Sequence, residues 1–464
     1  VLERHDYLSQ EQREAVRHIT GERSIEALTG FAGSGKSAAI AAARELWEAE
    51  GYRVWGAALS GIAAENLERA SGVRSRTLAA LELGWKQGRE RLAQRDIVVL
   101  DEAGMVGSRQ MERIVSEVHE RGAKLVLVGD AEQLQPIEAG AAFRAIAERI
   151  GYRELAGIRR QHEEWQREAS RDFARGEPGR ALELYHEHEA IHFAETRERA
   201  RADLIRAWGD DRAAQGAEKA SLMLAHTRAD VRELNEQARE LLKTRGELGR
   251  ELTVEVEREL MAPDGTLTRE RGERSFAPGE RVMFLKNDRY LGVKNGTLGR
   301  VLEIDQDHLR VKLDDGRAGR DVDFRLDDYA ALDYGYAATV HKAQGATVER
   351  SFVLATPGMD RHLAYVGMTR HREGVELFAG RDDFEDFAAL EARLSRARLK
   401  DFTLDYAHRR GLELDRDSTP HERRLEAARE LDHKIELLRE HPELGLGHDP
   451  LQSREGQERI IRVI

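Results

Sequence analysis

The 464-residue chain contains no cysteine. A chain without thiols can form no disulfide framework, hold no cysteine-ligated zinc and carry out no thiol catalysis, so we expect a reducing, cytoplasmic location. Long apolar runs are missing as well, since none approaches the roughly 18–20 residues that a membrane-spanning helix needs. The N-terminus also lacks the apolar core of a signal peptide, so the sequence predicts no membrane segment.

An excess of positive charge is also missing. The chain carries 74 basic and 86 acidic side chains, which give a net charge of −12. This balance excludes a uniformly basic nucleic-acid coat but allows a locally basic channel. The length exceeds what one ordinary hydrophobic core can organise, so we expect two to four domains. Because the chain begins at Val1 rather than at methionine and runs directly into a motif, we expect it to be a segment of a longer polypeptide.

The first chemical motif is a glycine-rich stretch over residues 28–37, which reads LTGFAGSGKS and fits the pattern G-x-x-x-x-G-K-[ST]. It lies between a short apolar strand expected over 25–28 and a helix expected over 37–50. In such a loop the backbone N–H groups point at phosphate oxygens, and the following helix presents its positive end. Lys36 would reach the β- and γ-phosphates, and the Ser37 hydroxyl would ligate Mg²⁺. The motif predicts a nucleoside triphosphate site built from Gly30, Gly33, Ser34, Gly35, Lys36 and Ser37.

A second motif follows an apolar, β-branched strand expected over residues 97–100. This strand runs directly into two adjacent carboxylates, Asp101 and Glu102. Asp101 is placed to hold Mg²⁺, and Glu102 is placed to activate an attacking water. Adjacent carboxylates at a strand end are common on protein surfaces, but a phosphate loop about 65 residues upstream makes the catalytic interpretation the stronger one.

A glutamine lies about twenty residues before the phosphate loop, in a helical pattern that Ser9 would cap. The amide of Gln12 can donate to N7 and accept from the exocyclic amine of adenine at the same time. The alternative is an ordinary solvated glutamine on a helix. The phosphate loop that follows favours adenine recognition.

The first third of the chain alternates strand and helix patterns, which indicates a parallel sheet with helices on both faces through about residue 150. Gln133 follows a further apolar strand over 124–128, and ligands gather at the carboxyl ends of such strands. An insert between residues 83 and 96 carries glycine, lysine and arginine and is suited to a protruding hairpin or arm. Trp85 in this insert would either split a duplex or pack against the domain.

The composition changes between about residues 276 and 324, where short β-type segments alternate with turn signals. Asn295-Gly296 is a strong signal for a hairpin turn. These segments predict a small antiparallel barrel that would bind nucleic acid or brace the fold. Strand and helix patterns resume after it, and beyond about residue 396 a highly charged stretch with one apolar helical stripe predicts a helical tail.

In chain order, these motifs resemble those of the superfamily 1 helicases, and within them the RecD-like 5′-to-3′ group that includes helicase domains of conjugative relaxases. The resemblance covers residues 5–380. It is carried by five stretches, namely Gly30 to Ser37, Asp101-Glu102-Ala103-Gly104-Met105, Gly129-Asp130 with Gln133-Leu134 and Pro136-Ile137, Val340-His341-Lys342-Ala343-Gln344-Gly345, and Tyr365-Val366 with Thr369-Arg370.

The resemblance implies an α/β fold in which two RecA-like P-loop domains with parallel sheets enclose ATP in the cleft between them. It also implies a small SH3-like β-barrel inserted in the second domain. The domains expected from it are a first RecA-like domain at 1–150, the first part of the second domain at 151–270, the barrel at 271–333, the second part of the second domain at 334–395 and a helical C-terminal region at 396–464.

The resemblance further implies ATP and Mg²⁺ as cofactors and a role for each motif residue. Gln12 would recognise adenine, Asp101 and Ser37 would hold the metal, and Ser60, Thr77, Thr339 and His341 would line single-stranded DNA. At the first of these DNA positions the chain reads Leu59-Ser60-Gly61 where the family more often has Pro-Thr. The residues implied in catalysis are Lys36, Glu102, Gln133, Arg160 and Arg370.

The function that the sequence favours is an ATP-dependent DNA helicase that moves 5′ to 3′ and acts on single strands and duplex junctions. An upstream relaxase domain in the same polypeptide is a further expected partner. One alternative is a catalytically weak DNA-binding or scaffold module of a larger DNA-transfer protein. Another is a P-loop ATPase that acts on protein or RNA. The presence of Lys36, Glu102 and Arg370 together favours the helicase, since a scaffold has no need of all three.

Overall fold

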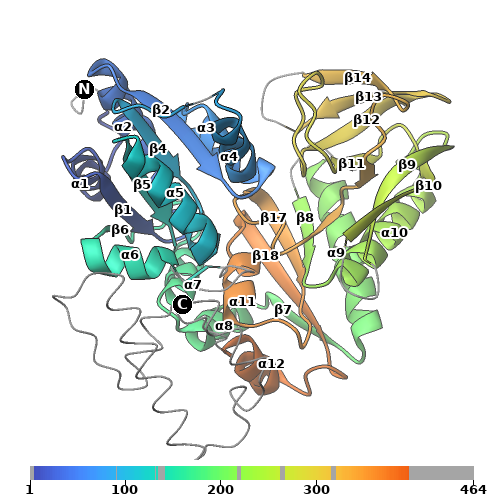
Figure 1. Cartoon of the computed structure of the whole chain (residues 1–464). Coiled ribbons are helices and arrows are strands. Elements are labelled where there is room, and N and C mark those ends of the chain that lie inside the picture. The colour runs from blue at the N-terminus through green and yellow to red at the C-terminus, as the bar shows by residue number, and fades with distance from the viewer. Residues whose placement is uncertain are drawn as a thin grey trace, which may run out of the picture.

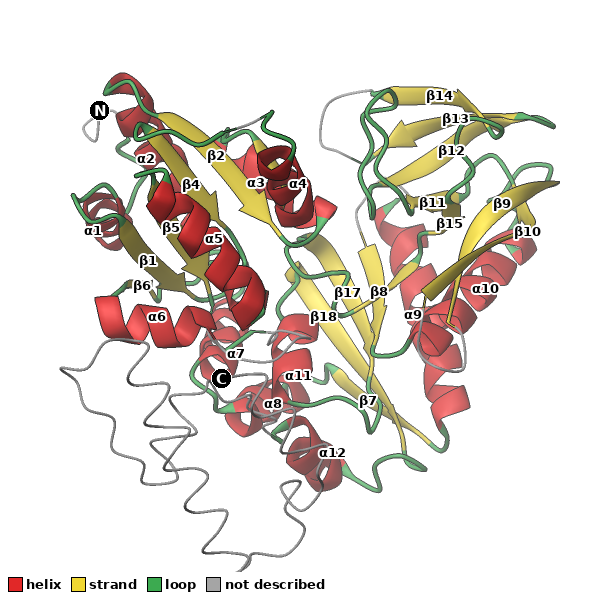
Figure 2. Ribbon diagram, in the orientation of Figure 1, coloured by secondary structure: helices red, strands yellow, loops and turns green. Residues whose placement is uncertain are grey.

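Two parallel β-sheets lie side by side at the centre of the computed structural model, which describes residues 5–89, 91–130, 132–133, 142–216, 221–261, 267–314 and 320–396 (Figure 1). Each sheet is covered by helices, and an antiparallel β region lies beside the second sheet (Figure 2). The α/β fold and the parallel sheet expected from the sequence are thus confirmed. None of the described helices is long and apolar enough to cross a membrane.

The first sheet has the strand order β3-β2-β4-β5-β1-β6, and every pairing in it is parallel. Its strands are β1 (Ile25–Gly30), β2 (Arg53–Ala58), β3 (Ser75–Thr77), β4 (Asp96–Leu100), β5 (Lys124–Gly129) and β6 (Arg153–Leu155). The helices that connect them are α1 (Gln10–Ile19), α2 (Lys36–Ala49), α3 (Gly61–Ser71), α4 (Leu78–Lys86), α5 (Ser108–Glu120) and α6 (Ala142–Ile150). Because β6 pairs with β1, this sheet continues five residues past the expected boundary at residue 150.

The second sheet is also fully parallel and has the order β16-β8-β17-β18-β7. Its strands are β7 (Ile191–Ala194), β8 (Ser221–Ala225), β16 (Ala337–Thr339), β17 (Val348–Leu354) and β18 (His371–Gly380). Its helices are α7 (Glu164–Ala174), α8 (Pro178–Glu187), α9 (Arg197–Gln215), α10 (Arg228–Thr244), α11 (Arg361–Met368) and α12 (Phe387–Leu394). Central strands such as β4 and β8 are buried along their whole length, as expected when helices cover both faces of a sheet.

The antiparallel region is inserted in the chain between β8 and β16, which pair directly with each other in the second sheet. A five-stranded sheet with the order β14-β13-β12-β11-β15 is formed by β11 (Arg281–Phe284), β12 (Leu298–Ile304), β13 (His308–Leu313), β14 (Asp321–Arg325) and β15 (Leu332–Tyr334). Within the described residues the two end strands are not paired with each other, so closure into an SH3-like barrel stays a prediction. Residues Asn295 and Gly296 do form a turn, but β11 and β12 are joined by a longer loop rather than by this turn alone.

A long hairpin was not expected from the sequence. Strands β9 (Leu252–Met261) and β10 (Leu267–Phe276) pair along their whole length just before the five-stranded sheet. Val254 and Val256 are buried while Thr253 and Glu255 are exposed, which is the two-residue period of a half-buried strand.

Of two further expectations, one is wrong and the other lies outside the described residues. The insert at 83–96 does not form a protruding hairpin, because the described residues there continue α4 to Lys86 and then follow an irregular loop to β4. Leu78, Leu81 and Trp85 lie on one face of α4, and Trp85 packs against the core of the first domain. The alternative of a packed tryptophan is therefore correct. Residues 397–464 lie outside the described residues, so the helical tail stays a prediction.

Candidate active site

The phosphate loop connects β1 to α2 and needs glycine at two positions. Gly33 and Gly35 have φ values of +81° and +85°, a region that favours glycine. A Cβ atom on Gly33 would lie 2.5 Å from Cβ of Arg160, and one on Gly35 would lie 2.3 Å from Nε2 of Gln12. The glycines therefore allow both the turn and the close approach of side chains from other elements. The loop residues from Ala32 to Ser37 line a cavity.

Lys36 opens α2, and its ammonium group is held close to the loop. Its Nζ donates to the carbonyl oxygens of Gly30 at 2.6 Å and Phe31 at 3.2 Å. The hydroxyl of Ser34 is buried and has no hydrogen-bond partner among the described residues. A bound phosphate group would supply acceptors to both side chains.

Asp101 and Glu102 follow β4 at the carboxyl edge of the first sheet. Glu102 has φ +52° and ψ +37°, a left-handed conformation that costs a non-glycine residue on the order of 1–2 kcal/mol. Its Oε2 accepts a hydrogen bond of 3.1 Å from Nε2 of Gln344, which belongs to the other domain. Burial, and then the negative charge of Glu102, raise the pKa of Asp101 to about 7. A cation between these carboxylates would reverse that shift.

Arg160 and Arg370 approach the same cavity from the second domain. Nη1 of Arg160 donates to the carbonyl oxygen of Thr369 at 2.6 Å, and Nε of Arg370 donates to that of Val366 at 3.0 Å. Arg370 is only 1% exposed. Burial, followed by the positive charge of Arg370, lowers the pKa of Arg160 to about 9, and burial also lowers the pKa of Arg370. Two neighbouring guanidinium groups that repel each other are suited to binding a multivalent anion.

The cavity between the domains has a volume of about 480 Å³, within the range typical of ligand sites. It brings together the phosphate loop, both carboxylates after β4, the expected catalytic residue Gln133 and the two arginines. Its lining includes Gly33, Ser34, Gly35, Lys36, Ser37, Asp101, Glu102, Gln133, Arg160 and Arg370. Of the expected site residues, Gly30 lies just behind this lining, where its carbonyl oxygen accepts from Lys36.

Gln12 lies next to the loop but is not among the residues that line the cavity. Its Oε1 accepts from the backbone N–H of Ser9 at 3.0 Å, which completes a capping box at the start of α1. Its Nε2 donates to the carbonyl oxygen of Gly35 at 3.2 Å. The same Oε1 also accepts from the hydroxyl of Ser9 at 3.4 Å, and Nε2 also donates to the carbonyl oxygen of Ser34 at 3.5 Å. The expected recognition of adenine by Gln12 stays a prediction.

The residues present fit a nucleoside triphosphate with one divalent cation. Within the described part of the chain there is no cluster of three or more histidine, aspartate or glutamate side chains that would hold a metal alone. Ser37 and Asp101 both line the cavity, and Mg²⁺ commonly combines one or two such oxygen ligands with phosphate oxygens and water. The pair is thus suited to a metal that arrives with the nucleotide.

The residues expected to line DNA lie at or just after strand ends, and none of the four is among the residues that line the cavity. Ser60 caps α3 by accepting from the N–H of Ala63, and Thr77 caps α4 by accepting from the N–H of Ala80. Because β2 and β3 are adjacent, with Ala58 opposite Thr77, the two hydroxyls lie at neighbouring helix N-termini. Such ends attract phosphate groups. Contact with DNA at these positions stays a prediction.

Thr339 and His341 follow β16 at the edge of the second sheet. The hydroxyl of Thr339 accepts from the N–H of Lys342 at 3.2 Å, which forms a tight turn after the strand. Burial, and then the charge of His226, lower the pKa of His341, so its imidazole is neutral at physiological pH. A neutral imidazole can still donate one hydrogen bond to a phosphate oxygen.

Helix α3 connects these two sets of residues across the domain boundary. The side-chain amide of Asn66 donates to the carbonyl oxygen of Gly345 at 3.0 Å. At the start of the same helix, a Cβ atom on Gly61 would lie 3.0 Å from Cβ of Lys294 in the antiparallel region. The first domain therefore meets both the turn after β16 and the loop before β12 through α3.

The sequence assigned no role to Gln344, although it lies in a motif that carries the resemblance. Its contact with Glu102 joins residues that are 242 positions apart. Glutamine between alanine and glycine has no chemical feature that distinguishes it from a solvated side chain. Only the fold reveals that it reaches the carboxylate.

Comparison with known proteins places these features in context. A family model described as "AAA domain" matches residues 7–196. The chain is 47% identical over 403 residues to the "Probable conjugal transfer protein TraA" of Sinorhizobium fredii, an alignment that covers 87% of this chain and 35% of that protein. It is 30% identical over 387 residues to the ATP-dependent RecD2 DNA helicase of Deinococcus radiodurans, with coverage of 79% and 48%. The chain thus spans about a third to a half of these relatives.

Solved structures provide the same fold at low sequence identity. The Pif1 helicase from Candida albicans aligns with a TM-score of 0.59 and 18% identity, over 88% of this chain and 99% of that chain. The Pif1 helicase from Bacteroides in complex with ADP-AlF3 and single-stranded DNA aligns with a TM-score of 0.55 and 21% identity, over 80% and 92% of the two chains. These similarities show a shared fold.

Proposed function

From the similarity of this chain to conjugal transfer proteins and to the RecD2 DNA helicase, we propose that it is a RecD-like superfamily 1 helicase that hydrolyses ATP and uses the energy to move 5′ to 3′ along single-stranded DNA. The observation that carries the proposal is the composition of the cavity. Lys36 and Glu102 reach it from the first domain, and Arg160 and Arg370 reach it from the second. Hydrolysis would then depend on how the two domains are arranged, which is the coupling that a motor needs.

Each side chain has a distinct task in this proposal. Lys36 and the loop N–H groups hold the β- and γ-phosphates, while Glu102 orients the attacking water and accepts its proton. Arg160 and Arg370 neutralise the charge that develops on the transferred phosphoryl group. Mg²⁺, when held by Ser37 and Asp101, would supply further positive charge to the phosphates. Gln133 senses the γ-phosphate.

Single-stranded DNA would lie across the ends of β2 and β3 in the first domain and the end of β16 in the second, which α3 connects. Hydroxyls at the helix N-termini of Ser60 and Thr77 and the turn at Thr339 offer donors to phosphate oxygens, and such contacts do not read sequence. The relatives named as conjugal transfer proteins further suggest that the chain is the motor segment of a cytoplasmic conjugation protein that also carries a relaxase domain. Duplex junctions would then be its substrates.

The substitution Glu102→Gln tests the catalytic part of the proposal. It keeps the size and the contact with Gln344 but removes the base, so we expect ATP turnover in the presence of single-stranded DNA to fall by roughly 10²–10⁴-fold. Binding of a fluorescent ATP analogue should remain within about twofold of wild type. Glu120→Gln, at an exposed position on α5, is the matched control and should hydrolyse ATP normally. Undiminished turnover in Glu102→Gln would reject the assignment.

Tailed duplexes test the direction of movement. We expect the protein to unwind a duplex with a 5′ single-stranded tail and to leave a duplex with a 3′ tail intact when ATP and Mg²⁺ are present. Lys36→Ala, which cannot hold the phosphates, serves as the inactive control on both substrates. Unwinding of the 3′-tailed duplex alone would contradict the RecD-like polarity, and ATP hydrolysis without unwinding of either would favour a translocase or scaffold.

A further inference from the structure

One tyrosine hydroxyl joins the two domains directly beside the phosphate loop. Tyr365 lies on α11 in the second domain and is only 1% exposed. Its hydroxyl donates to Oδ2 of Asp130 at 2.7 Å and accepts from the backbone N–H of Ala32 at 2.9 Å. Asp130 follows β5, and Ala32 belongs to the phosphate loop, so a single oxygen atom connects three segments that are far apart in sequence.

One partner of the hydroxyl lines the cavity, and the other contacts a residue that lines it. Ala32 lines the cavity next to Gly33. Oδ2 of Asp130 also accepts from Nε2 of Gln133 at 2.9 Å, and Gln133 lines the cavity as well. A displacement of the hydroxyl would therefore move a loop N–H group and the orientation of Gln133 together.

Arg370 follows directly after the end of the helix that carries the hydroxyl. Arg370 lies five residues after Tyr365, and its Nε donates to the carbonyl oxygen of Val366 in the last turn of α11. The position of α11 relative to the loop therefore fixes where the guanidinium group enters the cavity. In the geometry described, the oxygen of Tyr365 is the direct hydrogen-bonded link between that helix and the phosphate loop.

Other contacts hold α11 against the first domain without touching the cavity. Nη2 of Arg361 lies 2.8 Å from Oε2 of Glu132, and Nδ1 of His362 lies 2.8 Å from the carbonyl oxygen of Glu132. The Tyr365 ring itself stacks on Phe173 at 6.2 Å within the second domain. Removal of the hydroxyl alone would leave these contacts in place, so the two domains would still meet.

The direction of the hydrogen bonds is fixed by the surroundings. Burial, and then the charge of Asp130, raise the pKa of Tyr365 well above its ordinary value, so the phenol keeps its proton. The proton points to the carboxylate, and a lone pair remains for the N–H of Ala32. An N–H group that donates to tyrosine is held in one orientation, which preorganises the loop before a nucleotide arrives.

We propose that Tyr365 is a positioning residue that couples the contact between the domains to the arrangement of the γ-phosphate end of the site. The residue touches neither the nucleotide nor the reacting water; it acts through Ala32, Gln133 and Arg370. This proposal rests on the proposed ATPase function. It assigns the coupling to one buried hydroxyl rather than to the whole interface.

The substitution Tyr365→Phe tests the proposal because it removes the hydroxyl and keeps the ring. We expect kcat for DNA-stimulated ATP hydrolysis to fall by roughly 10–100-fold, because the free energy of one buried hydrogen bond in a network corresponds to a rate change of that size. KM for ATP and the affinity for ADP should remain within about twofold, because Lys36 and the β-phosphate contacts are unchanged. Affinity for ADP with aluminium fluoride, which occupies the γ-phosphate position, should fall with kcat.

The control is Tyr185→Phe. This hydroxyl is also buried and donates to the carbonyl oxygen of Met368, two residues before Arg370, but it lies wholly within the second domain. We expect kcat of this variant to stay within about threefold of wild type. A cycle with Asp130→Asn adds a second check, since Tyr365→Phe should cost little in that background if the two groups act together.

The outcomes separate the two proposals. Wild-type protein without ATP hydrolysis would reject the proposed function, and the comparison of ADP with ADP and aluminium fluoride would still test the hydroxyl. Active wild type with an equally active Tyr365→Phe variant would reject the positioning role alone. An equal loss of ADP affinity and kcat, or an equal loss in Tyr185→Phe, would indicate general destabilisation and would also overturn the proposal.

Discussion

Glu102 combines a strained backbone with a contact from the opposite domain. Within the described residues, the non-glycine residues with positive φ are Glu102 and Glu189. Strain of this kind persists where the surroundings enforce it, and it concentrates at functional sites. At Glu102 it turns the carboxylate from the strand end toward Gln344, across the cavity from the loop. The strain therefore supports the assignment of Glu102 as the residue that orients water.

His371 leads to a prediction about pH. The side chain is fully buried next to Arg370, and neither ring nitrogen has a hydrogen-bond partner among the described residues. Burial, and then the positive charge of Arg160, lower the pKa of His371 to about 3. The unfolded chain binds a proton near pH 6.5 but the folded chain does not, so stability is lost as pH falls from 6.5 toward 3.

Proton linkage gives the expected size of this change in the free energy of unfolding. Between pH 7.5 and 5.5 this histidine should lower the free energy of unfolding by about 1.4 kcal/mol. Denaturant titrations at both pH values should show that His371→Asn, which cannot bind the proton, lacks this decrease in the free energy of unfolding. His186→Asn, at an exposed position on α8, is the control and should keep it. An identical pH dependence in wild type and His371→Asn would show that the histidine does not contribute.

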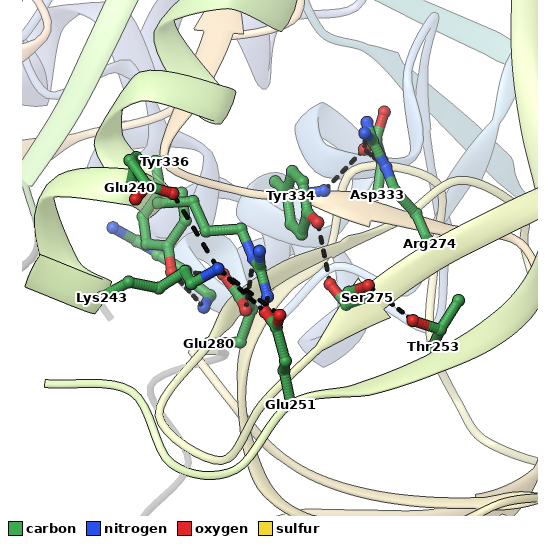
Figure 3. A network of polar contacts seen from close by, with 12 residues as sticks. Glu240, Lys243, Glu251, Thr253, Arg274, Ser275, Glu280, Asp333, Tyr334 and Tyr336 are labelled. Carbon is green, nitrogen blue, oxygen red and sulfur yellow. Dashed lines mark hydrogen bonds and ion pairs between the residues drawn. The ribbon is translucent and has the colours of Figure 1, made fainter. Parts of the chain in front are cut away.

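At the scale of elements, a buried polar network attaches the antiparallel region to the second domain (Figure 3). Glu280 precedes β11 and is completely buried. Its Oε1 accepts from the hydroxyl of Tyr336 at 2.7 Å, and its Oε2 accepts from Nε of Arg239 on α10 at 3.0 Å. Arg239 also donates to Glu251 just before β9. The five-stranded sheet, the hairpin and the strand that leads to Thr339 are thereby held together.

The substitution Glu280→Gln should destabilise the protein strongly. It leaves the guanidinium group of Arg239 half-buried with Glu251 as its remaining carboxylate partner, and removal of one partner of a buried pair costs about 3 kcal/mol. Chemical denaturation measures the change. Asp321→Asn breaks the exposed pair with Arg310 in the same sheet and should cost less than about 1 kcal/mol. Equal effects of the two substitutions would show that burial does not govern the strength of this network.

These elements also show what the sequence could and could not predict. The loop at 30–37 and the carboxylates after β4 depend on short patterns, and local geometry fixes their positions. The prediction of a protruding hairpin at 83–96 was wrong because the apolar stripe of α4 continues into that stretch. The hairpin of β9 and β10 was missed although its alternation of buried and exposed residues is visible in the sequence.

The remainder of the site depends on contacts between distant segments. Arg160 and Thr369 are 209 positions apart, and Tyr365 and Ala32 are 333 positions apart. No local pattern encodes such distances, because they result from the way in which two separate sheets pack against each other. The resemblance predicted which residues meet, but the hydrogen-bond partners that orient them, such as Gln344 for Glu102, required the fold.

At the scale of the whole molecule, one chain supplies both sides of the cavity. In many nucleotide hydrolases the arginine that completes the site comes from a second protein or subunit. Here Arg160 and Arg370 line the same cavity as Lys36 and Glu102. Contacts such as the one between Arg361 and Glu132 further join the two domains of the same chain. Hydrolysis should therefore need no second copy.

Mixing two inactive variants tests this expectation. Lys36→Ala removes the phosphate contact in the first domain, and Arg370→Ala removes the guanidinium group in the second, where its loss should cost roughly 10³–10⁵-fold in rate. If every site is completed within one chain, each protein in an equimolar mixture lacks one essential group, and the ATP turnover of the mixture should equal the sum of the two residual rates. If instead a neighbouring copy supplies the arginine, some sites in the mixture combine an intact loop with an intact arginine, and roughly a tenth or more of wild-type turnover should return. Recovery of that size with single-stranded DNA present would contradict the intramolecular site, whereas its absence would support a motor that works as a single chain.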